Sequence, residues 1–227
     1  MPDSGQLAPL RLESTPVLVA DRLRAGILDG TFPPRTQLSE VALSQQLSVS
    51  RGPIREAMQR LLQEGLLRGE RNRGVFVVDL GASDVRDIYL ARAAVERTAA
   101  SIVASSGSEE DFATLQSMVD KLAAAVDDDW VELTKLDLQF HLTLVAAADS
   151  PRLDRMFRTL VAESQLCIAR LEPFYTGRGE VVSEHQEIID AIQARDLDLV
   201  DRLVAAHMDV SAARLTSAEE QVGAEHT

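Results

Sequence analysis

The chain has 227 residues, of which 23 are basic and 36 are acidic, and its formal net charge at pH 7 is −13. Cys167 is the only cysteine, which excludes an intrachain disulfide and fits a reducing compartment. The sequence contains no apolar run of about eighteen residues and no basic region followed by an apolar core at its start. We therefore expect a cytoplasmic protein without a membrane span.

The charge is unevenly distributed along the chain. Residues 1–80 contain ten Arg, no Lys and nine Asp or Glu, a net charge of +1, whereas the remainder has 13 basic and 27 acidic residues, a net of −14. A near-neutral segment with a local basic stripe is compatible with DNA, and an acidic remainder keeps DNA from binding the wrong surface. The sequence predicts two domains, at 13–79 and 83–217.

Two short helices joined by a tight turn are predicted in the first domain. The first covers 39–47, residues 48–50 form the turn, and Ser50 is expected to cap the second helix. Arg51 and Arg55 share one face near the start of that helix, and the opposite face is apolar, with Ile54, Met58, Leu61 and Leu62. This layout is typical of a helix-turn-helix that reads DNA. The alternative is an ordinary helical hairpin with a solvated charged face.

A β-hairpin is predicted after the second helix. Turn-forming residues at 68–74 are followed by the β-branched and aromatic residues of 75–78. The tip of this hairpin carries Arg71 and Arg73. A basic hairpin directly after a helix-turn-helix is suited to phosphates or to a minor groove.

Residues from about 18 to 78 resemble the winged helix-turn-helix of the GntR regulators, through the segments 30–34, 38–40, 49–51, 53–57 and 73–74. Some members of this family carry a further DNA-contacting arginine where this chain has Val41. The resemblance therefore implies that Arg51 and Arg55 read guanine edges and that the hairpin holds the flanking backbone or minor groove. The expected DNA-binding residues are Ser50, Arg51, Gly52, Arg55, Arg71, Asn72, Arg73 and Gly74.

The remainder of the chain is predicted to be a helical bundle. Apolar residues recur at spacings of three and four, aromatics are scarce, and no strand pattern occurs. Six helices are expected, at about 83–105, 109–127, 130–148, 151–171, 179–195 and 197–217. The predicted fold class is mostly α: a winged helix-turn-helix of three helices plus a β-hairpin, then an all-α antiparallel bundle of about six helices. Residues 1–12 and the tail from 218 are expected to be loosely ordered.

Three of the four histidines fall within the predicted bundle helices. Asp137 and His141 are four residues apart, which puts a carboxylate and an imidazole on one helical face. His185 and His207 each lie eleven residues from the turn at Asp196, so an antiparallel hairpin brings them to the same level. One Asp and three His suit zinc first, with nickel or manganese as alternatives. The alternative is a set of hydrogen-bonded core histidines.

Residues from about 83 to 217 resemble the C-terminal effector (FCD) domain of the FadR branch of GntR regulators. The matching pieces are 92–96, Asp137 with Phe140 and His141, 184–185 with 188–192, and His207. Many members bind a divalent metal through one Asp and three His at these places, so the resemblance implies a metal site at Asp137, His141, His185 and His207. Ser150 stands where relatives have Asn, which is a departure near the cavity.

Three His and one Asp leave open positions on a five- or six-coordinate ion, and we expect a small carboxylate effector to fill them. Arg92 is the candidate to pair with this carboxylate in a forked geometry. Its alternative role is a salt bridge with Glu96, four residues on. The loop 172–179, with Arg178, is either a gate to the cavity or a simple connector.

Together these features predict a transcriptional repressor that binds a palindromic DNA operator as a homodimer and responds to a small organic acid. No catalytic residues are expected. A metal-dependent hydrolase is the first alternative, with Glu184 as the nearest general base, although adjacent helical residues such as Glu184 and His185 point about 100° apart. The second alternative is a regulator whose metal is purely structural.

Overall fold

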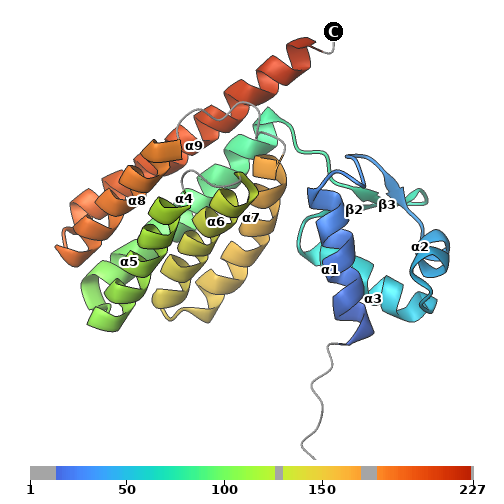
Figure 1. The fold of residues 1–227 in the computed structure, drawn as a ribbon, viewed down its shortest axis with the longest axis horizontal. Coiled ribbons are helices and arrows are strands. Elements are labelled where there is room, and N and C mark those ends of the chain that lie inside the picture. Colours follow the sequence, from blue (N-terminus) through green and yellow to red (C-terminus); the bar gives the residue numbers. More distant parts are fainter. Residues whose placement is uncertain (1–13, 126–129, 170–177, 226–227) are drawn as a thin grey trace, which may run out of the picture.

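A small three-stranded sheet and nine helices make up the parts of the chain that the computed structural model describes, residues 14–125, 130–169 and 178–225. An N-terminal domain holds the sheet and three helices, and a bundle of six helices follows (Figure 1). The expectation of a mostly α protein with a winged helix-turn-helix and a helical bundle is confirmed. No helix in these ranges is both long and apolar enough to cross a membrane.

The N-terminal domain combines the predicted helix-turn-helix with a small antiparallel sheet, in which the strand order is β1-β3-β2. The predicted hairpin is present, with Leu67 opposite Val77. A third strand that the sequence did not predict pairs Gln37 with Phe76, and at two residues it is too short to leave an alternating pattern. The elements are α1 (Thr15–Leu28), β1 (Gln37–Leu38), α2 (Glu40–Leu47), α3 (Arg51–Gln63), β2 (Leu67–Glu70) and β3 (Gly74–Val77).

Local sequence explains how α2 and α3 are joined. The Ser39 hydroxyl accepts a hydrogen bond from the backbone N–H of Ala42 at 3.4 Å and so caps α2. Ser48 ends α2 in the left-handed conformation, with φ of 54°. Ser50 occupies the N-cap position of α3, but its side chain makes no capping hydrogen bond, contrary to the prediction. The hydroxyl is therefore available to a ligand outside the domain.

The bundle follows the predicted order of helices. Its elements are α4 (Ala82–Ser106), α5 (Glu109–Ala124), α6 (Trp130–Ala147), α7 (Pro151–Ala169), α8 (Arg178–Gln193) and α9 (Leu197–Glu225). α9 runs beyond the expected end at 217, since the residues that follow are mostly good helix formers. The predicted loose N-terminal segment and most of the predicted loop at 172–179 lie outside the described residues.

The first bundle helix, α4, is central because it packs against α6, α7, α8 and α9. Its inward face combines small and apolar residues, such as Val95 and Ala99, with two charged residues, Arg92 and Glu96, that are almost fully buried. Arg195 closes the end of α4, since its guanidinium donates to the carbonyl of Ala104 at 2.9 Å. The helix that organises the core thus also carries an ion pair into it.

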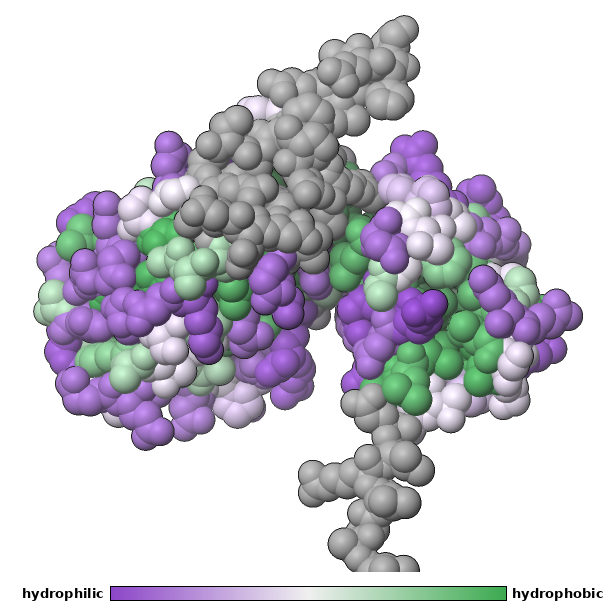
Figure 2. Space-filling view, in the orientation of Figure 1, coloured by the Kyte–Doolittle hydropathy of each residue, from purple (hydrophilic) through white to green (hydrophobic). Residues whose placement is uncertain are grey.

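The two domains are in contact where α1 meets α7. Glu163 of α7 lies over Gly65, which ends α3 with φ of +77°. A Cβ at Gly65 would lie 2.7 Å from Glu163 Oε1, so only glycine fits there without a shift. Figure 2 shows that hydrophilic residues cover most of both domains on this face, with apolar surface gathered on the N-terminal domain.

Gly65→Ala should lower the free energy of unfolding by about 1–2 kcal/mol from the left-handed backbone alone. The contact with Glu163 should add a further cost, which the double variant with Glu163→Ala should recover. Urea unfolding measures both. Gly69→Ala is the matched control, because a Cβ at Gly69 meets no atom within 4 Å. Equal stability of the two alanine variants would contradict the packing described here.

Candidate functional site

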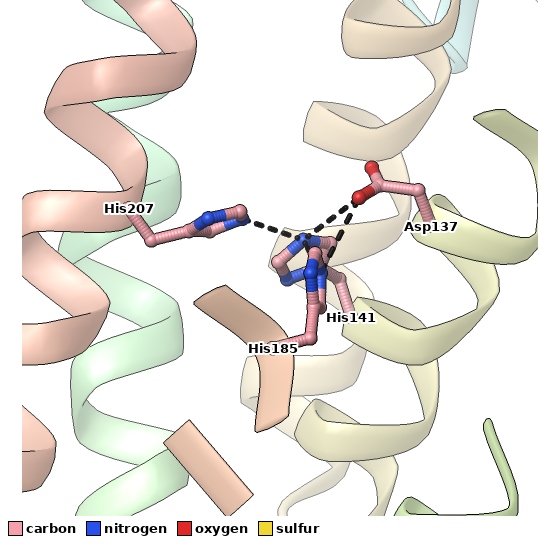
Figure 3. A group of neighbouring side chains, drawn as sticks. All are labelled: Asp137, His141, His185 and His207. Atoms are coloured by element: carbon pink, nitrogen blue, oxygen red, sulfur yellow. Dashed lines mark hydrogen bonds and ion pairs between the residues drawn. The ribbon is translucent and has the colours of Figure 1, made fainter. Parts of the chain in front are cut away.

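Three helices of the bundle bring four predicted ligand residues to one point. Asp137 and His141 come from α6, His185 from α8 and His207 from α9. One ligand atom from each lies within 4.8 Å of the others, and Figure 3 shows the three imidazoles and the carboxylate directed at a common centre. The three histidines are almost fully buried. The structure therefore joins the residues that helical spacing and turn symmetry placed together.

The hydrogen bonds of the histidines fix which ring nitrogen carries the proton. His185 Nδ1 lies 2.6 Å from the carbonyl oxygen of Val181, which can only accept, so Nδ1 must donate. His141 Nδ1 donates to Glu96 at 2.5 Å, and His207 Nδ1 donates to Glu184 at 2.7 Å. In the neutral tautomer each Nε2 then carries a lone pair rather than a hydrogen.

These three lone pairs face one another. His141 Nε2 lies 3.3 Å from both His185 Nε2 and His207 Nε2, and Asp137 Oδ1 lies 3.3 Å from His185 Nε2. Without a hydrogen between them, such pairs repel, and a cation at their centre removes the repulsion. Neutral imidazoles oriented through Nδ1 by a carboxylate or carbonyl are the usual arrangement of metal-bound histidines. The donor set therefore fits a divalent metal ion, whereas the core-histidine alternative requires a second proton on one of the rings.

The electrostatics of the cluster favour a neutral His185 ring and ionised carboxylates. Burial, together with the neighbouring His207, lowers the pKa of His185 to about 3. Burial alone would raise the pKa of the Glu96 carboxyl, but the charges of His141 and Arg92 outweigh it and lower this pKa to about 2. Burial likewise opposes ionisation of Asp137, yet the three histidines and Arg92 lower its pKa. Both carboxylates are thus negative at neutral pH.

Arg92 is more deeply buried than the sequence predicted, and it contacts two side chains. It is 1% exposed, its Nε donates to Glu96 at 2.9 Å, and its Nη1 lies 3.4 Å from the hydroxyl of Ser164. The salt bridge with Glu96 is therefore present, but buried rather than on the surface. Nη2 is the one buried side-chain nitrogen or oxygen without a partner in the described parts of the chain. Pairing of Arg92 with an effector stays a prediction, now limited to this single nitrogen.

A cavity of about 40 Å³ adjoins the cluster. Asp137 and His207 form part of its wall, and the guanidinium of Arg92 lies 4.7 Å from the ring centroid of Tyr89, which lines it. The remaining wall residues are Leu133, Thr134, Ile168, Val181, Ser211 and Leu215. A small ligand can therefore lie directly beside the candidate metal ligands.

The sequence analysis did not identify several of these residues, although helical spacing could have identified some of them. Ser211 follows His207 by four residues and Thr134 precedes Asp137 by three, so each shares a helical face with a ligand residue. Glu184 was considered only as the nearest general base of the hydrolase alternative, and its carboxylate pairs with His207 and Arg214. The contact of Glu96 with His141 has no local signal, because it joins two helices.

The predicted recognition arginines lie on the exposed face of α3. The side chains of Arg51 and Arg55 are 60% and 61% exposed. Glu40, at the start of α2, accepts from Arg55 Nε at 3.0 Å and from Nη2 at 2.9 Å, and lies 3.9 Å from Arg51 Nη2. The hydrogen bonds from Arg55 lower the pKa of the Glu40 carboxyl. One carboxylate thus holds the two arginines side by side.

The tip of the hairpin also carries exposed basic groups. Arg71, Asn72 and Arg73 are exposed between β2 and β3, and Asn72 adopts a φ of 60°. Arg73 forms an ion pair with Glu70, and its guanidinium lies 5.5 Å from the ring centroid of Phe76. The predicted DNA-binding residues of the helix and hairpin therefore belong to one small domain, with Ser50, Gly52 and Gly74 exposed among them.

Family models account for both domains. The model described as bacterial regulatory proteins, gntR family, matches residues 17–77, and that of the FCD domain matches residues 87–210. The chain belongs to the GntR family. The resemblance stated from the sequence is thereby confirmed.

Relatives of this GntR protein include named repressors. It is 30% identical over 202 residues to the gluconate operon transcriptional repressor of Bacillus licheniformis, covering 86% of this chain and 83% of the relative. It is 28% identical over 194 residues to the transcriptional repressor RspR of Escherichia coli K12, covering 82% of each. A solved GntR regulator from Rhodococcus sp. RHA1 is 30% identical with a TM-score of 0.74, and the match covers 91% of this chain and 99% of the other.

The candidate metal centre generates a prediction for the residues that hydrogen-bond to its histidines. Glu184→Gln should lower zinc affinity by about 10–100-fold, because the carboxylate that orients His207 is lost. His207→Ala should abolish zinc binding while the N-terminal domain stays folded. Zinc competition titration and elemental analysis measure these effects. Glu187→Gln, an exposed residue of the same helix, is the control and should bind zinc like the unmodified protein. Purified protein that holds no metal and takes up no zinc, nickel or manganese would refute the site.

Proposed function

We propose that this GntR regulator is a repressor that binds a palindromic DNA operator as a homodimer and is controlled by a small organic acid at a metal centre in the FCD domain. One observation carries the proposal. Three imidazole nitrogens and a carboxylate meet inside a helical domain, and that domain follows a winged helix with exposed arginines. The relatives named repressors support the direction of control.

The DNA-binding part of the proposal rests on exposure and charge. Arg51 and Arg55 lie near the start of α3 on its solvent-exposed face. Bidentate arginine contacts to guanine edges are the commonest specific contacts in a major groove. Glu40 holds the Nε edge of Arg55, which orders a long side chain before it meets a base. The exposed hairpin residues Arg71, Asn72 and Arg73 would contact the backbone or the minor groove.

The sensing part rests on the histidine cluster and its cavity. Asp137, His141, His185 and His207 would hold a divalent ion, with zinc first and nickel or manganese as alternatives. When bound, the ion supplies positive charge and open ligand positions for a carboxylate. The unpartnered Nη2 of Arg92 would provide a second positive group for the same anion.

A response requires that the acid bind one arrangement of the dimer better than another. α7 is the element best placed to relay the change. Ile168 lines the cavity, Ser164 contacts Arg92, and Glu163 lies over Gly65 at the end of the recognition helix. A shift of α7 on effector binding would therefore change how the DNA-binding domains are placed.

The hydrolase alternative has less support. A general base would have to face the cavity with a free carboxylate. The Glu184 carboxylate instead accepts from His207 and pairs with Arg214 at 3.1 Å, and it is not among the residues that line the cavity. A purely structural metal would leave the cavity beside it without a role, and effector titration with and without metal separates that alternative.

Arg55→Ala should weaken binding to a selected operator by roughly 1–3 kcal/mol and relax the preference at one base position. Arg51→Ala should do the same at a neighbouring position. Arg73→Ala should instead weaken all sequences evenly and reduce the salt dependence, as expected for a phosphate contact. Operators selected from random DNA, followed by binding titrations at several salt concentrations, provide the measurement. Unchanged affinity and selectivity of Arg55→Ala would exclude the proposed docking.

The regulator should be a dimer at micromolar concentration, because one winged helix covers only half of a palindromic site. Light scattering should give about twice the chain mass of 24.8 kDa. The first bundle helices and the DNA-binding domains are the surfaces we expect to form the dimer. A species with the mass of a single chain, at concentrations that saturate the operator, would contradict this assignment.

A further inference from the structure

The tip of the β2–β3 hairpin, residues 71–73, has a backbone that benefits from support outside the hairpin. The turn is closed by the N–H of Arg73, which donates to the carbonyl of Glu70 at 3.0 Å. Asn72 has a φ of 60° and Gly74 a φ of 111°, and residues other than glycine seldom adopt such values. A hairpin of two short strands is only marginally stable by itself, so another element has to help to keep this conformation.

Gln37 of β1 supplies a contact of this kind. Its side-chain Nε2 donates to the backbone carbonyl of Arg73 at 2.7 Å. A carbonyl can only accept, so the nitrogen end of the amide must face the hairpin. The side chain of Gln37 therefore ties β1 to the backbone at the hairpin tip.

Gly74 makes room for this hydrogen bond. Gln37 pairs with Phe76 across the sheet, and Gly74, two residues before Phe76, is the diagonal neighbour on the same face. A Cβ at Gly74 would lie 2.7 Å from Gln37 Nε2. Glycine is therefore needed at this position on two grounds, its positive φ and the close approach of the Gln37 amide.

The segment that begins with Gln37 also positions the recognition helix. Leu38 is 5% exposed and anchors β1 in the core. Two residues later, Glu40 accepts hydrogen bonds from Arg55 near the start of α3. Residues 37–40 therefore contact both exposed arginine groups of the domain, the one on α3 and the one at the hairpin tip.

The hydrogen bond from Gln37 is better explained by ordering than by stability. It is exposed to solvent, and such a bond adds little net stability because water can replace it. Ordering a long side chain at an interface, in contrast, costs free energy that a preorganised backbone reduces. The residues next to the Arg73 carbonyl, Arg71 and Asn72, are the exposed ones for which this cost would arise.

We propose that Gln37 is a positioning residue for DNA binding. It holds the backbone of the hairpin tip so that Arg71 and Arg73 meet the DNA backbone or minor groove in a preset orientation. The inference rests on the DNA docking proposed above. Gln37 acts through the tip and not on a base, so it governs affinity rather than the choice of sequence.

Gln37→Met tests this role, because it removes the amide donor and keeps a side chain of similar length without charge. Binding of the full-length protein to an operator selected from random DNA should weaken by about three- to tenfold, the cost of ordering a long side chain. The base preferences should stay unchanged. Gln63→Met is the matched control, because Gln63 is an exposed glutamine at the opposite end of α3 from Arg51. It should bind like the unmodified protein.

A double-mutant cycle separates positioning from a general loss of stability. In a protein that carries Arg71→Ala and Arg73→Ala, Gln37→Met should cause no further loss of affinity, because the side chains that it orients are gone. A loss caused by lower stability of the domain would be the same in both backgrounds. Hydrogen exchange of the DNA-free protein gives a second readout. The amides of residues 71–74 should exchange faster in Gln37→Met, and those of α3 should not.

A loss of affinity that requires both arginines, together with faster exchange at the tip, supports the inference. Operator binding of Gln37→Met that matches the unmodified protein overturns it, and so does an equal loss in the protein without the two arginines. Unchanged exchange at the tip overturns it as well, while the proposed DNA reader stands in all three cases. If Arg71→Ala with Arg73→Ala leaves operator binding unchanged, the proposed hairpin contact with DNA is wrong, and the role of Gln37 falls with it.

Discussion

The bundle depends on one constraint, which is that three unprotonated imidazole nitrogens face one another in its interior. His141, His185 and His207 come from three different helices, and each ring is held by an acceptor on Nδ1. With all three Nε2 atoms unprotonated, the fold imposes a local repulsion that a bound cation would relieve. The ion pair of Arg92 with Glu96 belongs to the same constraint, because Glu96 must stay ionised in a dry interior to orient His141. Replacing a buried ion pair by apolar side chains of similar volume is often neutral or stabilising, which is consistent with the binding role proposed for the cluster.

The two domains differ in where they place their charged side chains. The bundle buries charge and balances it, whereas the N-terminal domain exposes Arg51 and Arg55 and balances them with Glu40 alone. The carboxylate of Glu40 reduces the repulsion between the arginines and keeps their guanidinium groups ordered in the free protein. It also lowers the attraction for DNA phosphates in general. Under the docking proposed above, this pairing would lower non-specific affinity for DNA and raise selectivity.

The sequence predicted what is local and repeated, and failed where distant helices meet. Asp137 and His141 lie four residues apart on one helix, and spacing alone puts them on one face. His185 and His207 lie at equal distances from the turn that joins their two helices, so spacing also predicts that they are level. The partner of each Nδ1 could not be predicted, because Glu96 and Glu184 reach their histidines across helix interfaces. β1 was missed because two residues carry no period. Burial of Arg92 was missed because an i, i+4 pair with Glu96 has the same pattern on a surface as in a core.

The three acceptors that orient the histidines differ in stiffness. His185 is held by a backbone carbonyl of its own helix, that of Val181, and cannot turn without disturbing α8. His141 and His207 are held by glutamate side chains, and these are themselves paired, Glu96 with Arg92 and Glu184 with Arg214. The proposed metal centre would therefore be anchored through the backbone at one corner and through ion pairs at the other two.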